Sequence, residues 1–231
     1  MNENDGLDNF YTSYARHKKY AMPTLSKKDA GRFDDEIWEP ATFAPEHRCL
    51  EIGCGTGLFL AYLSSKGVSN FIGVDQDPAL AEVIPDGLIN RFLCVDAWVY
   101  LEDSPPAHYD RVVLLDVLEH FTAKDGFQLM SLIARVLTPD GKVVIKVPNA
   151  ASPWGLSYQV GDLTHCTGYS ENSLHQLATA SGFVVDVVYD QRRGSPRRKM
   201  TDAIVNHFLS WTLLTPPKFW GANLYAVLSR P

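Results

Sequence analysis

The sequence contains few cysteines and no long hydrophobic run. Its 231 residues include four cysteines, and no two of them form a CxxC pair. This distribution favours reduced, buried thiols in a cytoplasmic protein. No apolar run approaches the ~18 residues of a transmembrane helix, and the polar, acidic start MNENDGLDNF does not resemble a signal peptide. We therefore expect a cytoplasmic location.

Positive charge is scarce as well. The chain has 21 lysines and arginines against 27 aspartates and glutamates, which gives a net charge of −6. A protein that binds nucleic acid regardless of sequence needs an extended basic surface. The charge balance therefore argues against nucleic acid as a partner.

What the sequence does contain, from Arg48 onward, is a regular alternation of strand-like and helix-like segments. Apolar, strand-like runs occur at Cys49–Ile52, Phe71–Val74, Phe92–Val95, Val112–Leu115, Val143–Val147, Phe183–Tyr189 and Leu224–Leu228. Helical patterns include Leu58–Ser65, Gly126–Leu137 and a segment from the N-cap residue Ser170 to Ala180. Continuous apolar strands separated by helices indicate a parallel sheet that is covered on both faces. We predict an α/β fold with a doubly wound, mostly parallel, seven-stranded Rossmann-like sheet.

Some segments do not follow this alternation of strands and helices. We expect residues 1–47 to form an N-terminal helical cap, and residues 48–231 to form one domain with an insertion at about 191–218. Residues 148–169 are expected to be irregular. We expect four residues to share one helical face of the cap, at spacings of three: Tyr11, Tyr14, His17 and Tyr20. This face would either close over the cofactor and acceptor pocket or pack in the core.

Three glycines at alternate positions follow the first strand, in the stretch CLEIGCGTGLFLAYL. Glycine tolerates positive φ and lets a ligand approach the backbone closely, so Gly53, Gly55 and Gly57 predict a binding loop. Asp75 ends the second strand about 20 residues later, the spacing of a carboxylate that accepts hydrogen bonds from ribose hydroxyls. A ligand that carries adenosine is therefore expected. A nicotinamide dinucleotide is one alternative, although its fingerprint is GxGxxG and this loop is GxGxG.

This loop and four later segments, in the same order, resemble the class I S-adenosylmethionine-dependent methyltransferases. The later segments are the acid Asp75, CVDA after the third strand, YDRVVLLDVLEHF and LTPDGKVVIKVPN. The resemblance implies S-adenosylmethionine as cofactor, with Asp96 accepting from adenine and Asp116 between cofactor and acceptor. The cofactor-binding residues that it implies are Glu51, Gly53, Cys54, Gly55, Gly57, Asp75, Gln76, Asp96, Ala97 and Asp116. Helix capping or turn formation is the alternative role for Asp75 and Asp96.

Methyl transfer to a hydroxyl also needs a group that removes the hydroxyl proton. Candidates follow the fourth and fifth strands: Glu119 and His120 in the tripeptide LEH, and Asp162 and His165 in GDLTHCTGYS. We predict His165, His120 and Asp162 as catalytic residues, with packing as the alternative role for the histidines. Residues 148–174 resemble a segment of bacterial methyltransferases encoded with surface-polysaccharide biosynthesis. That resemblance implies a sugar hydroxyl as acceptor.

Two further resemblances keep other acceptors open. Methyltransferases of the terminal 2′-hydroxyl of small RNAs carry an E-x-x-E-H motif and a later histidine. Asp116, Glu119, His120 and His165 hold these positions here, with aspartate in place of the first glutamate. The likeness implies a divalent metal, Mg²⁺ or Mn²⁺, on Glu119, His120 and His165. Ubiquinone-type O-methyltransferases share LEH and imply a small-molecule acceptor, and a cofactor-binding module without turnover is the non-enzymatic alternative.

The insertion joins cations to apolar side chains. The basic run RRGSPRRK at 192–199 precedes DAIVNHFLSWTLL at 202–214, and two aromatic residues follow at 219–220. Cations beside aromatic residues predict peripheral contact with the inner face of a membrane through residues 192–220. A lid or a homodimer contact is the alternative for the same residues.

Overall fold

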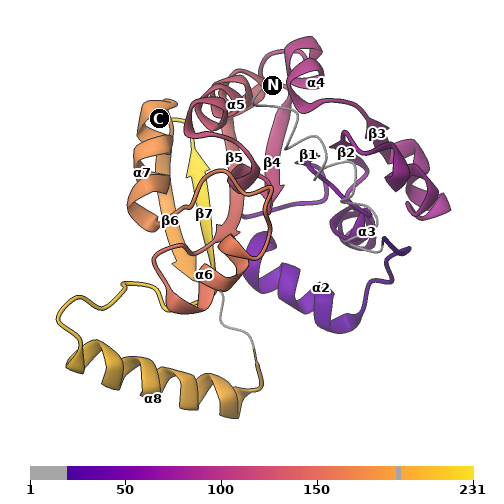
Figure 1. The fold of residues 1–231 in the computed structure, drawn as a ribbon. Helices are drawn as coiled ribbons and strands as arrows, with labels where there is room; N and C mark the ends of the chain where they lie inside the picture. Colours follow the sequence, from indigo (N-terminus) through magenta and orange to yellow (C-terminus); the bar gives the residue numbers. More distant parts are fainter. Residues whose placement is uncertain (1–19, 191–193) are drawn as a thin grey trace, which may run out of the picture.

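The fold is a seven-stranded sheet with helices on both faces (Figure 1), as the sequence predicts. The computed structural model describes residues 20–190 and 194–231. The strands lie in the order β3-β2-β1-β4-β5-β7-β6, and β7 alone runs antiparallel to its neighbours. Their bounds are β1 Arg48–Ile52, β2 Asn70–Asp75, β3 Phe92–Cys94, β4 Tyr109–Leu115, β5 Leu137–Pro148, β6 Val184–Asp190 and β7 Asn223–Ser229.

The central strands are mostly apolar because both of their faces are buried. Successive side chains of a strand point to opposite faces of the sheet, so Val112 and Leu114 pack on one side and Val113 packs on the other. The first face is covered by α4 (Ala97–Asp103), α5 (Ala123–Val136) and α7 (Glu171–Ala180). The second face is covered by α2 (Lys27–Phe33) and α3 (Leu58–Ser65). The helices on both faces hold the sheet in place, and the loops of the site project from this sheet.

One expectation about the chain after β5 is wrong. Residues 148–169 were expected to be irregular, but they contain α6 (Pro153–Val160). Its start follows ordinary capping chemistry, because the Ser152 hydroxyl accepts from the Trp154 N–H and Pro153 occupies the first turn. The Ser152-Pro153 pair was therefore a sequence signal for the start of a helix.

The expectation that all four cysteines are buried is also wrong. Cys49 and Cys54 are buried, whereas Cys94 and Cys166 are exposed, and all four are free thiols. Cys94 ends β3, a three-residue strand at the edge of the sheet, where one side of the strand meets solvent. Cys166 lies in the loop between α6 and α7.

The described part of the N-terminal region packs against the second face of the sheet. Phe33 and Ile37 are buried in the same apolar cluster as α3, and Ile37 belongs to the π-helical turn Asp34–Trp38 that follows α2. The Tyr20 hydroxyl donates to the Asp77 carboxylate at 2.9 Å, which brings this segment to the end of β2. The other aromatic residues expected on the cap lie outside the described residues: Tyr11, Tyr14 and His17.

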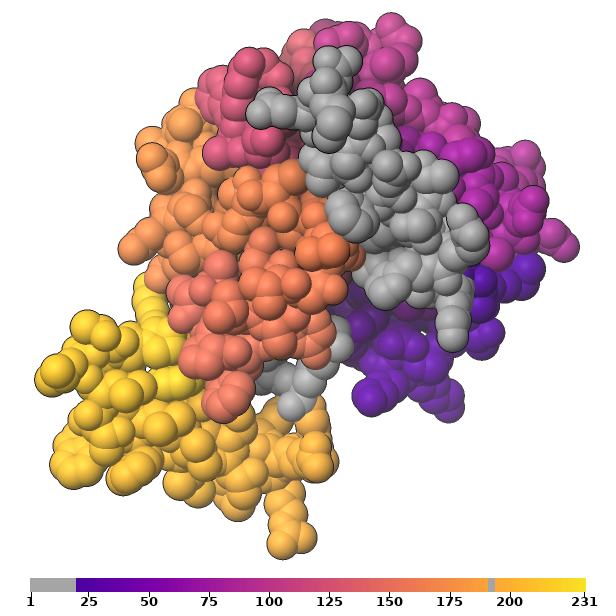
Figure 2. Space-filling model, in the orientation of Figure 1, coloured from indigo at the N-terminus to yellow at the C-terminus, as the bar shows by residue number. Residues whose placement is uncertain are grey.

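The insertion before β7 forms α8 (Pro196–Thr212), which projects from the body as a lobe (Figure 2). Three 3₁₀ turns complete the structure: Pro78–Glu82, Asp86–Arg91 and Leu118–His120. Within residues 20–190 and 194–231, no helix has both the length and the apolar character needed to cross a bilayer.

Candidate active site

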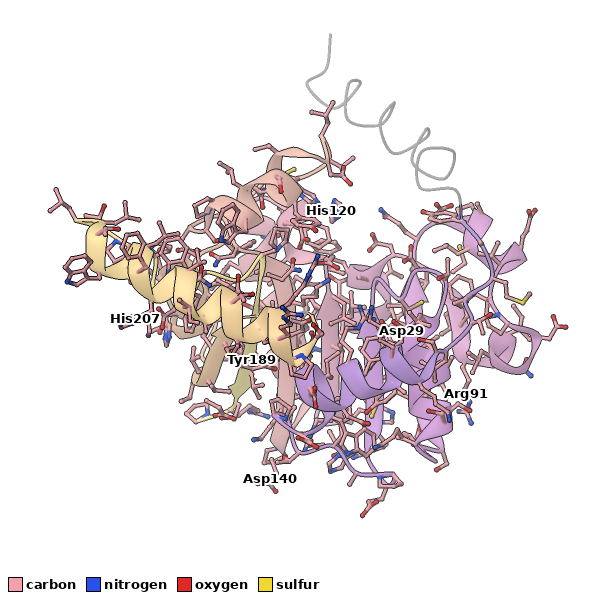
Figure 3. The ribbon with its side chains drawn as sticks, turned by 90° about the horizontal axis from the view of Figure 1, so that it is seen from below. Asp29, Arg91, His120, Asp140, Tyr189 and His207 are labelled. Atoms are coloured by element: carbon pink, nitrogen blue, oxygen red, sulfur yellow. The ribbon has the colours of Figure 1, made fainter. Side chains whose placement is uncertain are left out.

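The predicted site residues lie at or beyond the carboxyl ends of the five strands β1 to β5. The strand order reverses direction between β1 and β4, and in open α/β sheets ligands bind beyond the carboxyl ends of the strands at such a switch point. His120 lies at this edge, and Asp140, near the start of β5, lies at the opposite edge (Figure 3).

The glycine loop turns sharply after β1. The N–H groups of Gly53 and Cys54 both donate to the Val74 carbonyl, at 2.8 and 3.1 Å, which ties the loop to β2. Gly53 has φ +69°, and a Cβ there would lie 2.5 Å from a methyl group of Val117. Gly55 has φ +52°, and a Cβ there would meet no described atom within 4 Å. The backbone at Gly55 is therefore open to a ligand, whereas Gly53 is required by packing.

Asp75 holds this loop through both of its carboxylate oxygens. Its Oδ2 accepts from the Gly55 N–H at 3.0 Å, and its Oδ1 accepts from the Asp77 N–H at 3.1 Å. The turn-forming role named as an alternative is thus present. Each carboxylate oxygen has a second lone pair, so these bonds leave acceptor capacity for ribose hydroxyls. Burial raises the pKa of Asp75 above its ordinary value. Gln76, the next residue, is exposed.

Glu51 is a buried acid, and one of its carboxylate oxygens lacks a hydrogen-bond partner within residues 20–190 and 194–231. Only 3% of the residue is exposed, and the oxygen in question is Oε2. Burial, together with the charge of Asp75, raises its pKa well above the ordinary value. A buried carboxylate is costly unless a cation or hydrogen-bond donors offset it. S-adenosylmethionine carries an ammonium and a sulfonium, so its charges fit the acids predicted to hold it.

Asp96 is the N-cap of α4. Its Oδ1 accepts from the N–H groups of Trp98 and Val99, at 2.9 and 3.2 Å. The capping role named as an alternative is therefore present, and a contact with adenine stays a prediction. Ala97 begins the helix beside it. Cys54 is buried in the second apolar cluster, where burial raises its pKa, so only its backbone is suited to a polar ligand.

Asp116 lies directly after β4 in a strained conformation. Its φ is +59°, in the left-handed region that residues other than glycine rarely adopt. Its N–H donates to the Lys146 carbonyl at 3.0 Å, and its carboxylate forms an ion pair with the Lys146 ammonium. Strain of this kind often occurs at functional sites, where surrounding contacts maintain it. Here the contacts with β5 hold the carboxylate at the end of two adjacent strands.

Glu119 is the most deeply buried acid of the group. The residue has no exposed surface, and neither carboxylate oxygen has a hydrogen-bond partner among the described residues. Burial is the main reason that its pKa rises to about 8, and the nearby charge of Asp116 adds to the shift. Its carbonyl accepts from the N–H groups of Cys166 and Thr167, at 2.7 and 3.1 Å. Glu119 therefore also fixes the loop that carries His165.

A hydrogen-bond chain sets the tautomer of His120. The Thr164 hydroxyl donates to the Asp162 Oδ1 at 2.6 Å, and it lies 2.9 Å from the His120 Nδ1. A hydroxyl has one proton. Since that proton goes to the carboxylate, the His120 Nδ1–H must donate to the Thr164 oxygen. The lone pair of the neutral His120 ring is then on Nε2, and Asp162 acts on it through Thr164.

The same logic applies to His165. Its Nδ1 lies 3.0 Å from the Gln159 carbonyl, and a carbonyl can only accept. The Nδ1 therefore carries the proton and the lone pair is on Nε2. The two imidazole rings lie 4.7 Å apart, nearly perpendicular to each other. One carboxylate oxygen of Glu119 and one ring nitrogen from each of His120 and His165 all lie within 4.8 Å of one another. Three potential bases or metal ligands therefore converge.

These groups line a cavity of about 400 Å³. Its wall includes the predicted residues Asp116, Glu119, His120, Asp162 and His165. The structure thus brings together, at one cavity, all the residues predicted to act on the acceptor.

Several residues of this site were not predicted from the sequence. Lys146 was signalled by a lone cation inside the apolar run VVIKVP, since a buried strand seldom carries an unpaired charge. Thr164 and the carbonyl of Gln159 had no such signal, because their role depends on how the loop folds back on the 3₁₀ turn. Tyr158 and Asn223, also in the cavity wall, come from α6 and the start of β7.

Comparison with known proteins points to one family. The family model described as "Methyltransferase domain" matches residues 14–188. The methyltransferase GfsG of Streptomyces halstedii is 30% identical over 123 residues, which are 49% of this chain and 42% of that protein. The ubiquinone biosynthesis O-methyltransferase of Idiomarina loihiensis is 28% identical over 135 residues, 56% of this chain and 53% of that protein. The chain thus aligns with about half the length of these relatives.

A solved structure matches over nearly the whole chain. It is an S-adenosylmethionine-dependent methyltransferase from Archaeoglobus fulgidus, with a TM-score of 0.69 and 21% identity over 95% of this chain and 99% of that one. At this level of identity the likeness establishes the fold.

Proposed function

The chain belongs to the methyltransferase-domain family, and from this premise we propose that it is an O-methyltransferase that acts on a sugar hydroxyl. S-adenosylmethionine supplies the methyl group and leaves as S-adenosylhomocysteine. The observation that carries the proposal is the convergence of Glu119, His120 and His165 on one cavity, with both imidazole lone pairs on Nε2. A hydroxyl acceptor loses a proton when its oxygen is methylated, and these groups can accept it.

The chain contributes positioning and proton transfer. Positioning of the acceptor oxygen supplies much of the acceleration in a reaction of this type. His165 accepts the hydroxyl proton on Nε2, and its Nδ1–H bond to the Gln159 carbonyl keeps the ring oriented and stabilises the charged imidazolium. The Asp162–Thr164 pair gives His120 the corresponding support. Both rings are thus held in a fixed orientation, with their lone pairs on Nε2.

A small-molecule hydroxyl is the second candidate acceptor. It is favoured by one relative, the ubiquinone biosynthesis O-methyltransferase of Idiomarina loihiensis. The sugar is favoured by the polar wall of the cavity, where carboxylates, imidazoles and the amide of Asn223 offer partners for several hydroxyl groups.

Transfer of labelled methyl groups tests the proposal. Incubation with methyl-labelled S-adenosylmethionine and separate pools of glycans, small phenols and RNA should label the glycan pool, and the label should survive mild base, as an ether does. Transfer to phenols would replace the sugar by the small-molecule acceptor, and transfer to RNA would replace both. Label on nitrogen or carbon would refute O-methylation, and binding of the cofactor without transfer to any pool would favour a non-catalytic module.

We propose, as the alternative to direct proton removal by His165, that Glu119, His120 and His165 hold a divalent metal ion, in which case the Nε2 lone pairs bind the ion instead of a proton. The fit rests on the two unpartnered Glu119 oxygens and on the tautomers, because metal-bound histidines usually donate their other ring N–H to a carbonyl or an oxygen partner. Ligands that bind one ion at about 2.1 Å lie at most about 4.2 Å apart, so small side-chain rotations would close the cluster. Two imidazoles favour Mn²⁺ over Mg²⁺. Such an ion would lower the pKa of the acceptor hydroxyl.

Direct metal binding tests this second proposal. Calorimetric titration with Mn²⁺, checked by the electron paramagnetic resonance signal of the bound ion, should show one site per chain. Glu119→Gln should weaken binding by about 100-fold or more, because the variant loses a ligand as well as a charge. Glu102→Gln, at an exposed acid of α4, serves as the matched control. Equal Mn²⁺ affinity of Glu119→Gln and the wild type, or no binding by either, would exclude the metal.

A further inference from the structure

The helix α8 (Pro196–Thr212) stands apart from the rest of the fold. It lies in the connection between the antiparallel strands β6 and β7 and has no buried residue. Figure 3, seen from below, shows it lying across the near side of the molecule. A helix in this position normally turns its apolar face to the protein and its polar face to water.

The side of α8 that faces the body is mostly polar. Between the helix and the body lies a groove of about 780 Å³, whose wall on the α8 side includes Asp202, Asn206 and Ser210, together with the cations Arg198 and Lys199 and the small apolar side chains Ala203 and Val205. The Ser210 hydroxyl accepts from the Trp220 indole N–H at 2.9 Å, which is a contact of α8 with the chain before β7. Asn206 and Ser210 are partly shielded from solvent, whereas most of the helix is exposed. Polar side chains thus occupy the side where apolar ones would be expected.

The opposite side of α8 is an apolar stripe. It consists of Met200, Ile204, Phe208 and Trp211, which are spaced four, four and three residues apart and therefore share one face. None of the four lines the groove, and 57% to 79% of their surface is exposed. Leu214, just beyond the helix, is fully exposed. The amphipathic pattern of α8 is thus turned outward.

Cations flank the stripe at the start of the helix. Arg197, Arg198 and Lys199 occupy the first turn, where the helix dipole disfavours positive charge. Arg198 and Lys199 also line the groove, and all three residues are exposed. Residues 191–218 contain six lysines and arginines and one acid, in a chain whose net charge is −6. Positive charge is therefore concentrated here, at a position that does not serve the stability of the helix.

We propose that the outer face of α8 binds an anionic lipid surface. The Met200–Trp211 stripe would enter the boundary between headgroups and acyl chains, and the cations of the first turn would contact anionic headgroups. Charge decides between this occupant and a second copy of the chain: a lipid surface rich in anionic headgroups complements the cationic helix start, whereas the same face of a second copy is also cationic. Tyr158 and Asn223 line both the groove and the 400 Å³ cavity, so a protein docked in this way could receive an acceptor anchored in the bilayer.

Sedimentation with vesicles tests the proposal. The full chain should sediment with vesicles that contain phosphatidylglycerol, bind vesicles of phosphatidylcholine alone about tenfold or more weakly, and dissociate as salt is raised. The double variant Phe208→Ser, Trp211→Ser should lower the partition coefficient about tenfold or more. The triple variant Arg197→Gln, Arg198→Gln, Lys199→Gln should lower it about 100-fold, because each cation near the surface contributes about fivefold.

Matched controls test whether vesicle binding depends on the stripe or on exposed apolar side chains in general. The double variant Val99→Ser, Phe127→Ser removes exposed apolar side chains from α4 and α5 and should sediment like the wild type. Binding of S-adenosylmethionine should be equal in all variants, which keeps this test independent of the proposed activity. Wild-type chain that binds neither vesicle, or a Phe208, Trp211 variant that binds as well as the wild type, would refute the proposal. So would a homodimer that this variant dissociates, since the stripe would then be the contact between two copies.

Discussion

Replacement of His165 by alanine is expected to lower kcat by about 10²- to 10⁴-fold, the usual contribution of a general base. The variant loses the Nε2 lone pair at the cavity, whereas the glycine loop and the acids at β1 and β2 stay intact. The Kd for S-adenosylmethionine should therefore remain within about twofold of the wild type. Single-turnover transfer of labelled methyl groups gives the rate, and calorimetry gives the Kd.

The matched control for this prediction is His175→Ala. His175 is an exposed histidine of α7 whose Nε2 lies 3.9 Å from a carboxylate oxygen of Glu171. Because it lies outside the cavity, its loss should leave kcat within about twofold of the wild type. A fall of less than about threefold in His165→Ala would contradict the assignment of the base and direct attention to His120, the other imidazole at the cavity.

The approximate positions of the seven strands and of the first two site loops could be predicted from the sequence. The reason is physical: strands buried on both faces must be mostly apolar, and the glycines after Ile52 permit backbone conformations that other residues resist. The convergence of His120 and His165 could be predicted in the same way, because the carboxyl ends of parallel strands share one edge of the sheet. Local sequence patterns and the sheet topology were sufficient to predict these features.

Other features depend on packing that no local pattern reveals. The periodicity of α8 defines its apolar face but does not say whether that face meets the body or solvent. The link from Asp162 through Thr164 to His120 exists only because the loop before α7 is bonded to the Glu119 carbonyl. Exposure of Cys94 likewise follows from the place of β3 at the sheet edge, which strand-like composition does not reveal.

The two acids predicted to bind adenosine show how one residue can serve both structure and ligand. Asp75 supports the glycine loop through the Gly55 N–H, and Asp96 caps α4. A carboxylate that accepts backbone N–H bonds is fixed in orientation, and a fixed acceptor loses less entropy when a ligand hydroxyl or amine binds to it. The structural role is therefore compatible with the predicted role in ligand binding.

Replacement of Asp75 by alanine is expected to weaken S-adenosylmethionine binding by about 100-fold or more. Hydrogen bonds to a charged acceptor contribute about 1.5–3 kcal/mol each, and the ribose offers two hydroxyls. The variant also leaves the N–H groups of Gly55 and Asp77 without the carboxylate that they now share, so the glycine loop loses its fixed shape. Calorimetric titration measures the Kd, and thermal unfolding shows whether the fold persists.

Asp140→Ala is the control for this variant, because Asp140 is an exposed acid at the opposite edge of the sheet (Figure 3). Removal of its charge should change the Kd by less than about twofold, since an exposed charge at that distance is largely screened. A Kd for Asp75→Ala within about threefold of the wild type, in a protein that still unfolds cooperatively, would mean that Asp75 only supports the loop. The adenosine would then have to be held by the remaining acids, Glu51 and Asp96, and by the backbone that Gly55 leaves open.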